Sequence, residues 1–235
     1  MRAIFKREFN SYFTSLLGYV FLTIFLLLTG AMFTIVNVFQ YQTANMTYFF
    51  ASINNIAVFF LPLLTMRLFS EDRKLKTDQL LMTAPVSLRD IVLGKFFAAV
   101  CVLLIGTAIT IIYPIILMFF GELPIAETIS CYVGFVLLCS VILSIGAFMS
   151  SVTESQIVAA VSTYGIIIFM MLLSTLAQLI SNEAVSGALL WLSPIQRFSD
   201  FSLGIFDFEP IIYYLTVTGL FLFLTMTVFE KRRLR

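Results

Sequence analysis

The chain has 235 residues, of which 60% are hydrophobic and only 11% are charged, with a net charge of +1 and a mean hydropathy of +1.03. A soluble domain carries about 25% charged residues, so a chain this apolar cannot cover a water-exposed surface. We therefore expect a single membrane domain over residues 1–235. The near-neutral charge gives no sign of a nucleic-acid partner, and the absence of histidine excludes His triads, His metal sites and His proton relays.

The first 14 residues predict an amphipathic helix in the membrane interface. Its apolar side chains recur at helical spacing, at Ile4, Phe5, Phe9, Tyr12 and Phe13, and the polar residues Arg2, Lys6, Arg7 and Asn10 fall mostly elsewhere on the helical wheel. Such a helix lies in the plane of the interface, and the alternative is a basic flank of the first span. The apolar run that follows is too long for the h-region of a signal peptide.

Six apolar segments follow, each about long enough to cross a hydrocarbon core of roughly 30 Å as a helix. They lie at about 16–39, 51–69, 92–119, 130–150, 157–180 and 211–229. Lipid satisfies no backbone hydrogen bonds, and the alternating pattern of a β-barrel is missing. The sequence therefore predicts an all-α membrane protein with six transmembrane helices, and Pro62 is expected to kink the second.

The basic residues indicate how the chain is oriented. Thirteen of the 14 Lys and Arg residues precede span one, surround the link between spans two and three, or follow span six, and only Arg197 lies on the other side. The positive-inside rule then places both termini in the cytoplasm. The link between spans four and five is cytoplasmic by alternation.

The spans themselves contain almost no ionisable side chains. Arg67 and Lys95 lie at the cytoplasmic ends and are expected to snorkel toward water. Their scarcity argues against an ion- or proton-coupled transporter and against an intramembrane acid–base enzyme. Asn37, Asn54 and Asn55 are candidate polar residues of a pathway, although such amides more often hydrogen-bond between helices. In span four, the small residues Gly134, Ser140, Ser144, Gly146 and Ala147 predict close helix packing.

The cysteines Cys101, Cys131 and Cys139 are isolated in or beside apolar runs. We interpret them as packing residues rather than metal or redox groups, so no metal site is predicted.

The link between spans two and three carries the most informative pattern. A charged cluster, Glu71 to Lys74, is followed by Thr77, by the apolar triplet Leu80-Leu81-Met82 and by Pro85. This pattern predicts a short amphipathic helix on the cytoplasmic face, with exposed apolar residues that form a docking surface for a partner. The alternative is a helix lying flat on lipid headgroups.

The longest outer link, 181–210, is unusually apolar for a segment between spans. It predicts short helices that dip into the outer leaflet or cap the bundle, and the alternative is an interfacial belt of aromatic residues. We expect Arg197 to pair with Asp200, at helical contact spacing, while aromatic packing dominates. The residues assigned to this outer gate are Trp191, Pro194, Arg197, Phe198, Asp200, Phe201 and Phe208.

The stretch 61–97 resembles the first cytoplasmic loop of the permease subunits of type-2 ABC exporters. The resemblance rests on Leu64-Thr65-Met66-Arg67, Glu71, Arg73, Thr77, Leu80-Leu81-Met82, Pro85-Val86 and Ile91-Val92-Leu93-Gly94-Lys95. By chain length and by this loop, the chain is most similar to the gliding-motility-type and copper-maturation-type permeases. Two positions depart from the pattern, because Lys76 replaces a glycine and Gln79 replaces an acidic residue.

This resemblance implies the permease subunit of an ATP-driven exporter in the bacterial cytoplasmic (inner) membrane, with the pathway between two permeases, identical or related. It implies a coupling helix that inserts into a separate ABC ATPase subunit, and it leaves room for an accessory extracytoplasmic or membrane subunit. The implied coupling residues are Glu71, Asp72, Arg73, Thr77, Asp78, Gln79, Leu80, Leu81, Met82, Pro85, Glu154 and Gln156.

No phosphate-binding loop of the form GxxxxGK[ST] occurs, because Arg89 stands where the first glycine before Gly94-Lys95 belongs, and Phe96 where Ser or Thr belongs. The chain is therefore expected to be no enzyme and to hold no cofactor, with ATP and Mg²⁺ bound by the partner subunit. A membrane scaffold or assembly protein and a secondary transporter are the rival classes, and the lack of carboxylates in the spans disfavours the second.

Overall fold

The described part of the computed structural model consists of helices and their connections, and it comprises residues 1–41, 44–77, 86–179, 186–187, 190, 193–202, 204 and 208–233. No strand occurs in these ranges, and six helical segments are long and apolar enough to cross a membrane. They are Leu16–Tyr41, Thr47–Lys74, Leu88–Met118, Ile125–Val152, Gln156–Ala177 and Phe208–Arg233. The predicted all-α architecture with six spans is confirmed.

The six spans are mostly longer than the apolar segments seen in the sequence, and several of them are divided into more than one helix. The bounds of the individual helices are α1 Arg2–Thr14, α2 Leu16–Phe33, the π-helix η1 Thr34–Tyr41, α3 Thr47–Thr65, α4 Ser70–Lys74, α6 Leu88–Thr110, α7 Ile112–Met118, α8 Ile125–Val152, α9 Gln156–Leu179, α11 Phe198–Ser202 and α12 Phe208–Arg233.

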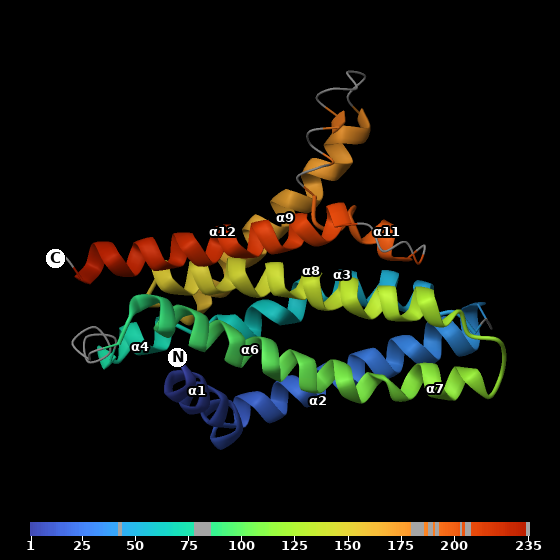
Figure 1. Ribbon diagram of the computed structural model, residues 1–235, viewed down its shortest axis with the longest axis horizontal. Coiled ribbons are helices and arrows are strands. Elements are labelled where there is room, and N and C mark those ends of the chain that lie inside the picture. The colour runs from blue at the N-terminus through green and yellow to red at the C-terminus, as the bar shows by residue number, and fades with distance from the viewer. Residues whose placement is uncertain are drawn as a thin grey trace.

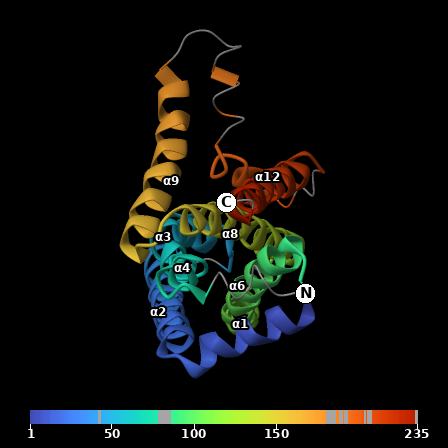
Figure 2. The same ribbon diagram turned by 90° about the vertical axis from the view of Figure 1, so that its left-hand side faces the viewer.

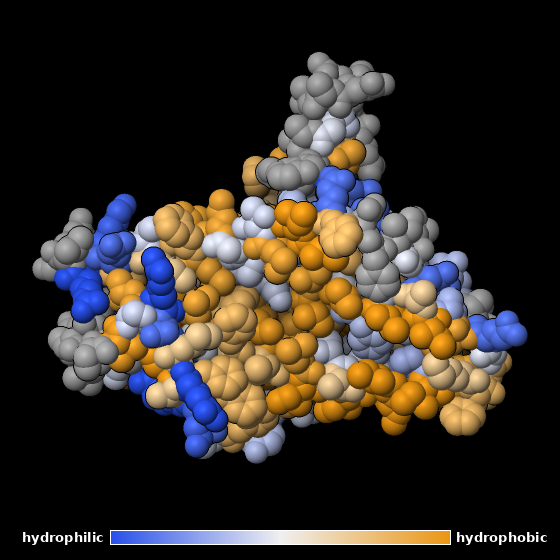
Figure 3. All heavy atoms as spheres, viewed as in Figure 1, coloured by the Kyte–Doolittle hydropathy of each residue, from blue (hydrophilic) through white to orange (hydrophobic). Residues whose placement is uncertain are grey.

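Most of the spans run along the long axis of the molecule, and both chain termini lie at the same end (Figure 1). We call this the terminal end and the opposite one the distal end. Helix α8 lies at the centre, in contact with α3, α6, α9, α11 and α12. Helix α1 crosses the terminal end beside α6, whereas α9 diverges from the other spans (Figures 1 and 2). Hydrophilic residues gather toward the two ends, with a largely apolar surface between them (Figure 3).

The small residues of α8 let its neighbours approach closely, as predicted. A Cβ atom at Gly134 would lie 2.6 Å from Cγ of Phe201, and one at Gly146 would lie 2.0 Å from Oγ1 of Thr65. Such distances are too short for any side chain, so the two glycines determine where α11 and α3 meet α8.

Candidate functional site

A buried group of charges joins three elements at the terminal end. Lys95, on α6, is only 2% exposed, and its Nζ lies 2.7 Å from Oδ2 of Asp72 and 3.1 Å from Oε1 of Glu8 on α1. Nζ also donates to the carbonyl oxygen of Leu68 at 2.7 Å. We call this group the Lys95 junction. The three donors of the ammonium thus meet three oxygen acceptors.

The expectation that Lys95 snorkels to water is wrong, and the reason is the position of α1. Gly94 lets α1 lie directly on α6, since a Cβ at Gly94 would be 3.1 Å from Ile4 and 3.3 Å from the backbone nitrogen of Phe5. Helix α1 therefore covers the first turns of α6, and Lys95 is stabilised by protein carboxylates in place of water.

The junction is balanced in charge. Arg7 donates to Oε1 of Glu8 at 2.7 Å, so two carboxylates are matched by two cations, Lys95 and Arg7. The hydrogen bond to Glu8 raises the pKa of Arg7, against the smaller opposing effect of burial. Thr77 donates to the second oxygen of Asp72 at 2.8 Å, which orients that carboxylate. Each of these charged groups needs a partner because an unpaired charge in a buried site is strongly unfavourable.

A second set of contacts joins the segment that contains Asp72 to the end of α8. The backbone nitrogens of Phe69 and Ser70 both donate to Oγ of Ser150 at 3.0 Å, and that hydroxyl donates to the carbonyl oxygen of Met66 at 3.1 Å. Arg73 forms an ion pair of 2.9 Å with Glu154 and also donates to the carbonyl oxygen of Val152. Residues 66–77, which we call the junction segment, are thus bonded directly to α6 and α8, and Lys95 links them to α1.

The structure therefore brings together part of the coupling set assigned from sequence. Glu71, Asp72, Arg73 and Thr77 lie in the junction segment, and Glu154 from the second link contacts it through Arg73. Glu71 is engaged by Arg67 at 2.5 Å, one helical turn earlier. Gln156 begins α9 at the same end. The remaining members, Asp78, Gln79, Leu80, Leu81, Met82 and Pro85, lie outside the described residues.

At the distal end, α11 packs into the bundle through two of the predicted gate residues. Phe198 and Phe201 are buried, and Phe201 lies against Gly134 of α8. The hydroxyl of Tyr214, on α12, donates to the carbonyl oxygen of Pro194 at 2.6 Å and so fixes the segment that leads into α11. These contacts place Phe198 and Phe201 inside the protein rather than in a surface belt.

Other gate residues differ from expectation. Arg197 forms an ion pair of 2.6 Å with Glu209, at the start of α12, whereas the sequence spacing favoured Asp200. The guanidinium of Arg197 also lies 5.7 Å from the ring centre of Tyr213. Phe208 is 78% exposed, so it does not pack within this chain as the gate assignment implied. Trp191 lies outside the described residues.

The three candidate pathway amides have three different environments. Asn37 is buried on η1 and donates to the carbonyl oxygen of Asn45 at 2.7 Å. Asn54 is buried inside the bundle, whereas Asn55 is exposed on the surface of α3 and donates to the carbonyl oxygen of Ala51 at 3.1 Å. They do not form one polar lining within this chain.

Sequence reasoning missed Glu8, Ser150 and the role of Lys95. A signal for two of them was present, since Glu8 is the one acidic residue of the basic N-terminal helix and Lys95 follows four uncharged residues of a span. Charges in such places have opposite partners when they are buried. Ser150 gave no signal, because a serine in a span usually bonds within its own helix.

The fold and the site together define a multi-pass helical membrane protein with an ion-paired junction at one end. The family model described as ABC-2 family transporter protein matches residues 2–234, so the chain belongs to that family. It is a membrane permease of an ABC transporter, and the family implies an ABC ATPase partner and a lipid bilayer around the spans. The comparison with curated proteins gives no match.

Proposed function

We propose that this permease is the membrane subunit of an ATP-driven exporter and that a separate ATPase subunit moves its junction segment. The observation that carries this proposal is the Lys95 junction together with the contacts of Ser150 and Arg73. A segment that is bonded to α6 and α8 and linked to α1 through Lys95 transmits a displacement to three elements rather than bending alone. The chain then needs no nucleotide site of its own, and ATP and Mg²⁺ are bound by the partner.

The terminal end faces the cytoplasm in this proposal. The Lys and Arg residues before span one, around the link between spans two and three and after span six support it by the positive-inside rule. The membrane is the bacterial cytoplasmic membrane, and the loop motif of 61–97 favours the gliding-motility or copper-maturation type of permease. Cysteines placed at Lys74 and Arg233 in a cysteine-free variant should react with a membrane-impermeant reagent only from the cytoplasm, and one at Asn182 only from outside.

A second permease, identical or related, completes the pathway. The exposed side of α3 supports this, because it carries an amide in the middle of a span. Its exposed residues recur every three or four positions, at Tyr48, Ala51, Asn55 and Phe59. An amide turned to lipid is unfavourable and hydrogen-bonds between helices when it can. A cysteine at Asn55 should therefore cross-link two copies, whereas one at the exposed Ile112 of α7 should not.

The docking element of the proposal is the amphipathic stretch around Leu80-Leu81-Met82. Leu81→Asp would place a charge in a desolvated contact at a cost of several kcal/mol if it stays unpaired. It should reduce both the retention of the ATPase subunit in a pull-down and transport in proteoliposomes, and Leu81→Met is the matched control. Unchanged retention and transport would remove this stretch from the interface and favour a helix lying on headgroups.

ATP hydrolysis separates the proposed function from its rivals. The purified chain alone should hydrolyse no ATP, and hydrolysis should appear with the ATPase subunit. Hydrolysis by the chain alone would contradict the assignment of the reaction to a partner. Failure to form any complex with an ATPase would favour a scaffold or a secondary transporter.

The distal segment around α11 closes the exit in this scheme. Because Phe198 and Phe201 are buried whereas the ion pair of Arg197 has an exposed partner, the aromatic contacts supply most of the closure. Replacing both phenylalanines by alanine should raise basal ATP hydrolysis of the full complex, and Arg197→Ala should do much less. The reverse order would make Arg197 a substrate contact.

A further inference from the structure

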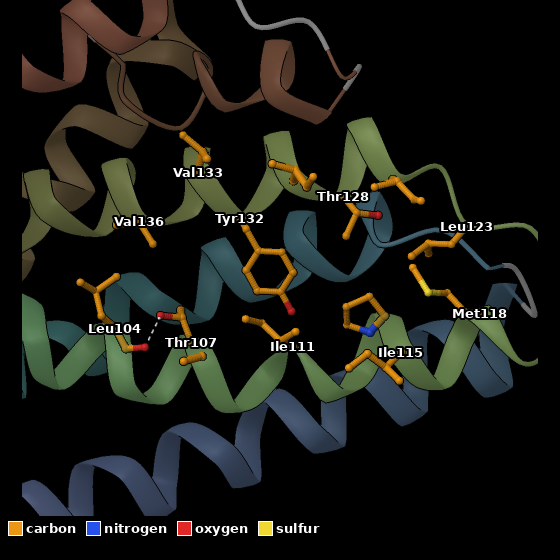
Figure 4. A pocket seen from close by; sticks show the side chains of 14 residues that line it. Leu104, Thr107, Ile111, Ile115, Met118, Leu123, Thr128, Tyr132, Val133 and Val136 are labelled. Atoms are coloured by element: carbon orange, nitrogen blue, oxygen red, sulfur yellow. Dashed lines mark hydrogen bonds between the residues drawn. The ribbon is translucent and has the colours of Figure 1, made fainter.

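An open apolar groove lies between two spans, away from the Lys95 junction and from the exposed side of α3. It is formed by the distal half of α6, by α7 and by the first half of α8, and it encloses about 440 Å³ (Figure 4). Its walls are aliphatic except for three hydroxyl side chains, one methionine and one proline, and none of the described residues that line it is charged. Lining residues labelled in the close view include Leu104, Ile111, Ile115, Met118, Val133 and Val136.

The groove is built around a break in the third span. Pro114 has no backbone N–H to donate to the carbonyl oxygen of Thr110, four residues earlier, and α6 ends at Thr110 before α7 begins at Ile112. The hydroxyl of Tyr132, from α8, donates to that carbonyl oxygen at 2.9 Å. The tyrosine thus satisfies the backbone group that the proline leaves free, and its ring spans the groove between α8 and the break (Figure 4).

The hydroxyl groups that line the groove are already used within the protein. Thr107 donates to the carbonyl oxygen of Leu103 at 2.9 Å, Thr128 donates to that of Pro124 at 2.9 Å, and Tyr132 donates to Thr110. None of these side chains has a proton left for an occupant. The groove therefore fits a molecule that is apolar over its whole buried length, and it offers water few hydrogen bonds.

The position of the groove indicates what that molecule is. The groove lies within two membrane spans, and its rim residues Ile115, Met118, Ile125 and Ile129 are exposed on the same apolar surface that contacts the bilayer. The groove is thus continuous with the hydrocarbon region. The apolar molecules available there are the acyl chains of lipids, and burying each methylene contributes about 0.8 kcal/mol.

We infer that the groove between α6–α7 and α8 binds one acyl chain of a lipid from the distal leaflet. The lack of free donors means that the protein holds the chain and leaves the headgroup unselected. This site is separate from the pathway proposed between permeases, and it depends only on the membrane location of the spans.

The experiment uses the full chain in vesicles of phosphatidylcholine and phosphatidylglycerol with a trace of phosphatidylcholine that carries a diazirine on one acyl chain. After irradiation, the labelled peptides are mapped by mass spectrometry. Peptides of α6, α7 and the first half of α8 should be labelled several-fold more than those of α9, although the α9 span is the more exposed. The same preference should hold when phosphatidylethanolamine carries the diazirine, because the headgroup is not recognised.

A groove-filling variant makes the test specific. Ala108, exposed and lining the groove, is replaced by phenylalanine, and Ala31, exposed on α2 outside it, is replaced in the same way as the control. Ala108→Phe should lower labelling of the groove peptides to the level of α9, whereas Ala31→Phe should not. Labelling of α9 in the same sample reports whether each variant is inserted in the membrane, and the free energy of unfolding in SDS reports whether it is folded.

Three results would overturn the inference. The first is equal labelling of all lipid-facing helices, which means that lipids make only annular contact. The second is labelling of the groove peptides that Ala108→Phe does not change. The third is cross-linking of two copies through cysteines at Ile115, which means that a second chain covers the groove.

Discussion

Replacing Lys95 by methionine tests the most unusual feature of the terminal end. Methionine has a similar length and no charge, so the change removes the ammonium while keeping most of the apolar stem. The carboxylates of Glu8 and Asp72, which lie 3.1 Å and 2.7 Å from Nζ, then face each other without it. The carbonyl oxygen of Leu68 loses its donor as well.

The expected magnitude follows from these distances and from burial. At an effective dielectric constant of about 20, a pair at 2.7 Å attracts by about 6 kcal/mol. Desolvation offsets most of this, at several kcal/mol per ion. Removing one partner of a buried pair costs about 3–5 kcal/mol, since the other charge stays behind. Glu8 and Asp72 keep 17% and 20% of their side-chain exposure, so we expect about 3 kcal/mol, the lower limit.

The assay is the free energy of unfolding of the purified full chain, measured by titration with SDS in mixed micelles. A triple variant, Lys95→Met with Glu8→Gln and Asp72→Asn, removes the unpaired charges and should recover more than half of the loss, as replacement of whole buried ion pairs often does. Arg67→Met is the control, because Arg67 and Glu71 are 31% and 34% exposed. That control should lose less than about 1 kcal/mol.

Two results would refute this reasoning. One is a loss in Lys95→Met no larger than that in Arg67→Met, which would mean that water reaches the junction. The other is a triple variant no more stable than the single one, which would mean that the aliphatic stem rather than the charge stabilises this end.

Two further predictions concern packing in the bundle. Gly146→Ala should lower the free energy of unfolding by about 1–3 kcal/mol in the same titration, since its Cβ would lie 2.0 Å from Oγ1 of Thr65. Gly165→Ala is its matched control, because no neighbouring element lies within 4 Å of a Cβ there. Alanine is the better helix former, so this variant should be more stable by about 0.5–1 kcal/mol. A destabilised Gly165→Ala or an unaffected Gly146→Ala would contradict the packing described for these helices. Tyr214→Phe should cost about 1–3 kcal/mol and loosen the segment before α11, because the carbonyl oxygen of Pro194 loses its donor in a buried place; unchanged stability together with unchanged protease sensitivity of that segment would show that the bond contributes nothing.

The six spans were predictable from the sequence because lipid imposes a local rule. A segment that crosses hydrocarbon must satisfy its own backbone, so length and apolar composition suffice to place a helix. The close packing at the glycines of α8 was predictable for a similar reason. A residue without a side chain allows another helix to approach closely, whichever helix that is. The motif of 61–97 indicated the family in the same local way, from residues near one another in the chain.

The partners of charged side chains could not be predicted from the sequence. Several carboxylates were possible partners for each cation, and only the fold selects among them. For Arg197, helical spacing favoured Asp200, but the start of α12 brings Glu209 to 2.6 Å. Asn54 and Asn55 are consecutive residues of the same type in the same span, and only the rotation of α3 against α8 buries one and exposes the other.

Lys95 shows most clearly the difference between what the sequence predicts and what the fold decides. Its sequence position predicted a side chain that reaches water, and that would hold for an isolated span. In the folded protein, α1 lies across α6 at Gly94 and leaves Lys95 only 2% exposed, and Glu8 and Asp72 supply the opposite charge. The sequence alone therefore determined which segments enter the membrane, because the bilayer acts on each segment separately. Only the tertiary structure decided which charges are buried and paired, because burial depends on elements that are distant in the chain and meet in space.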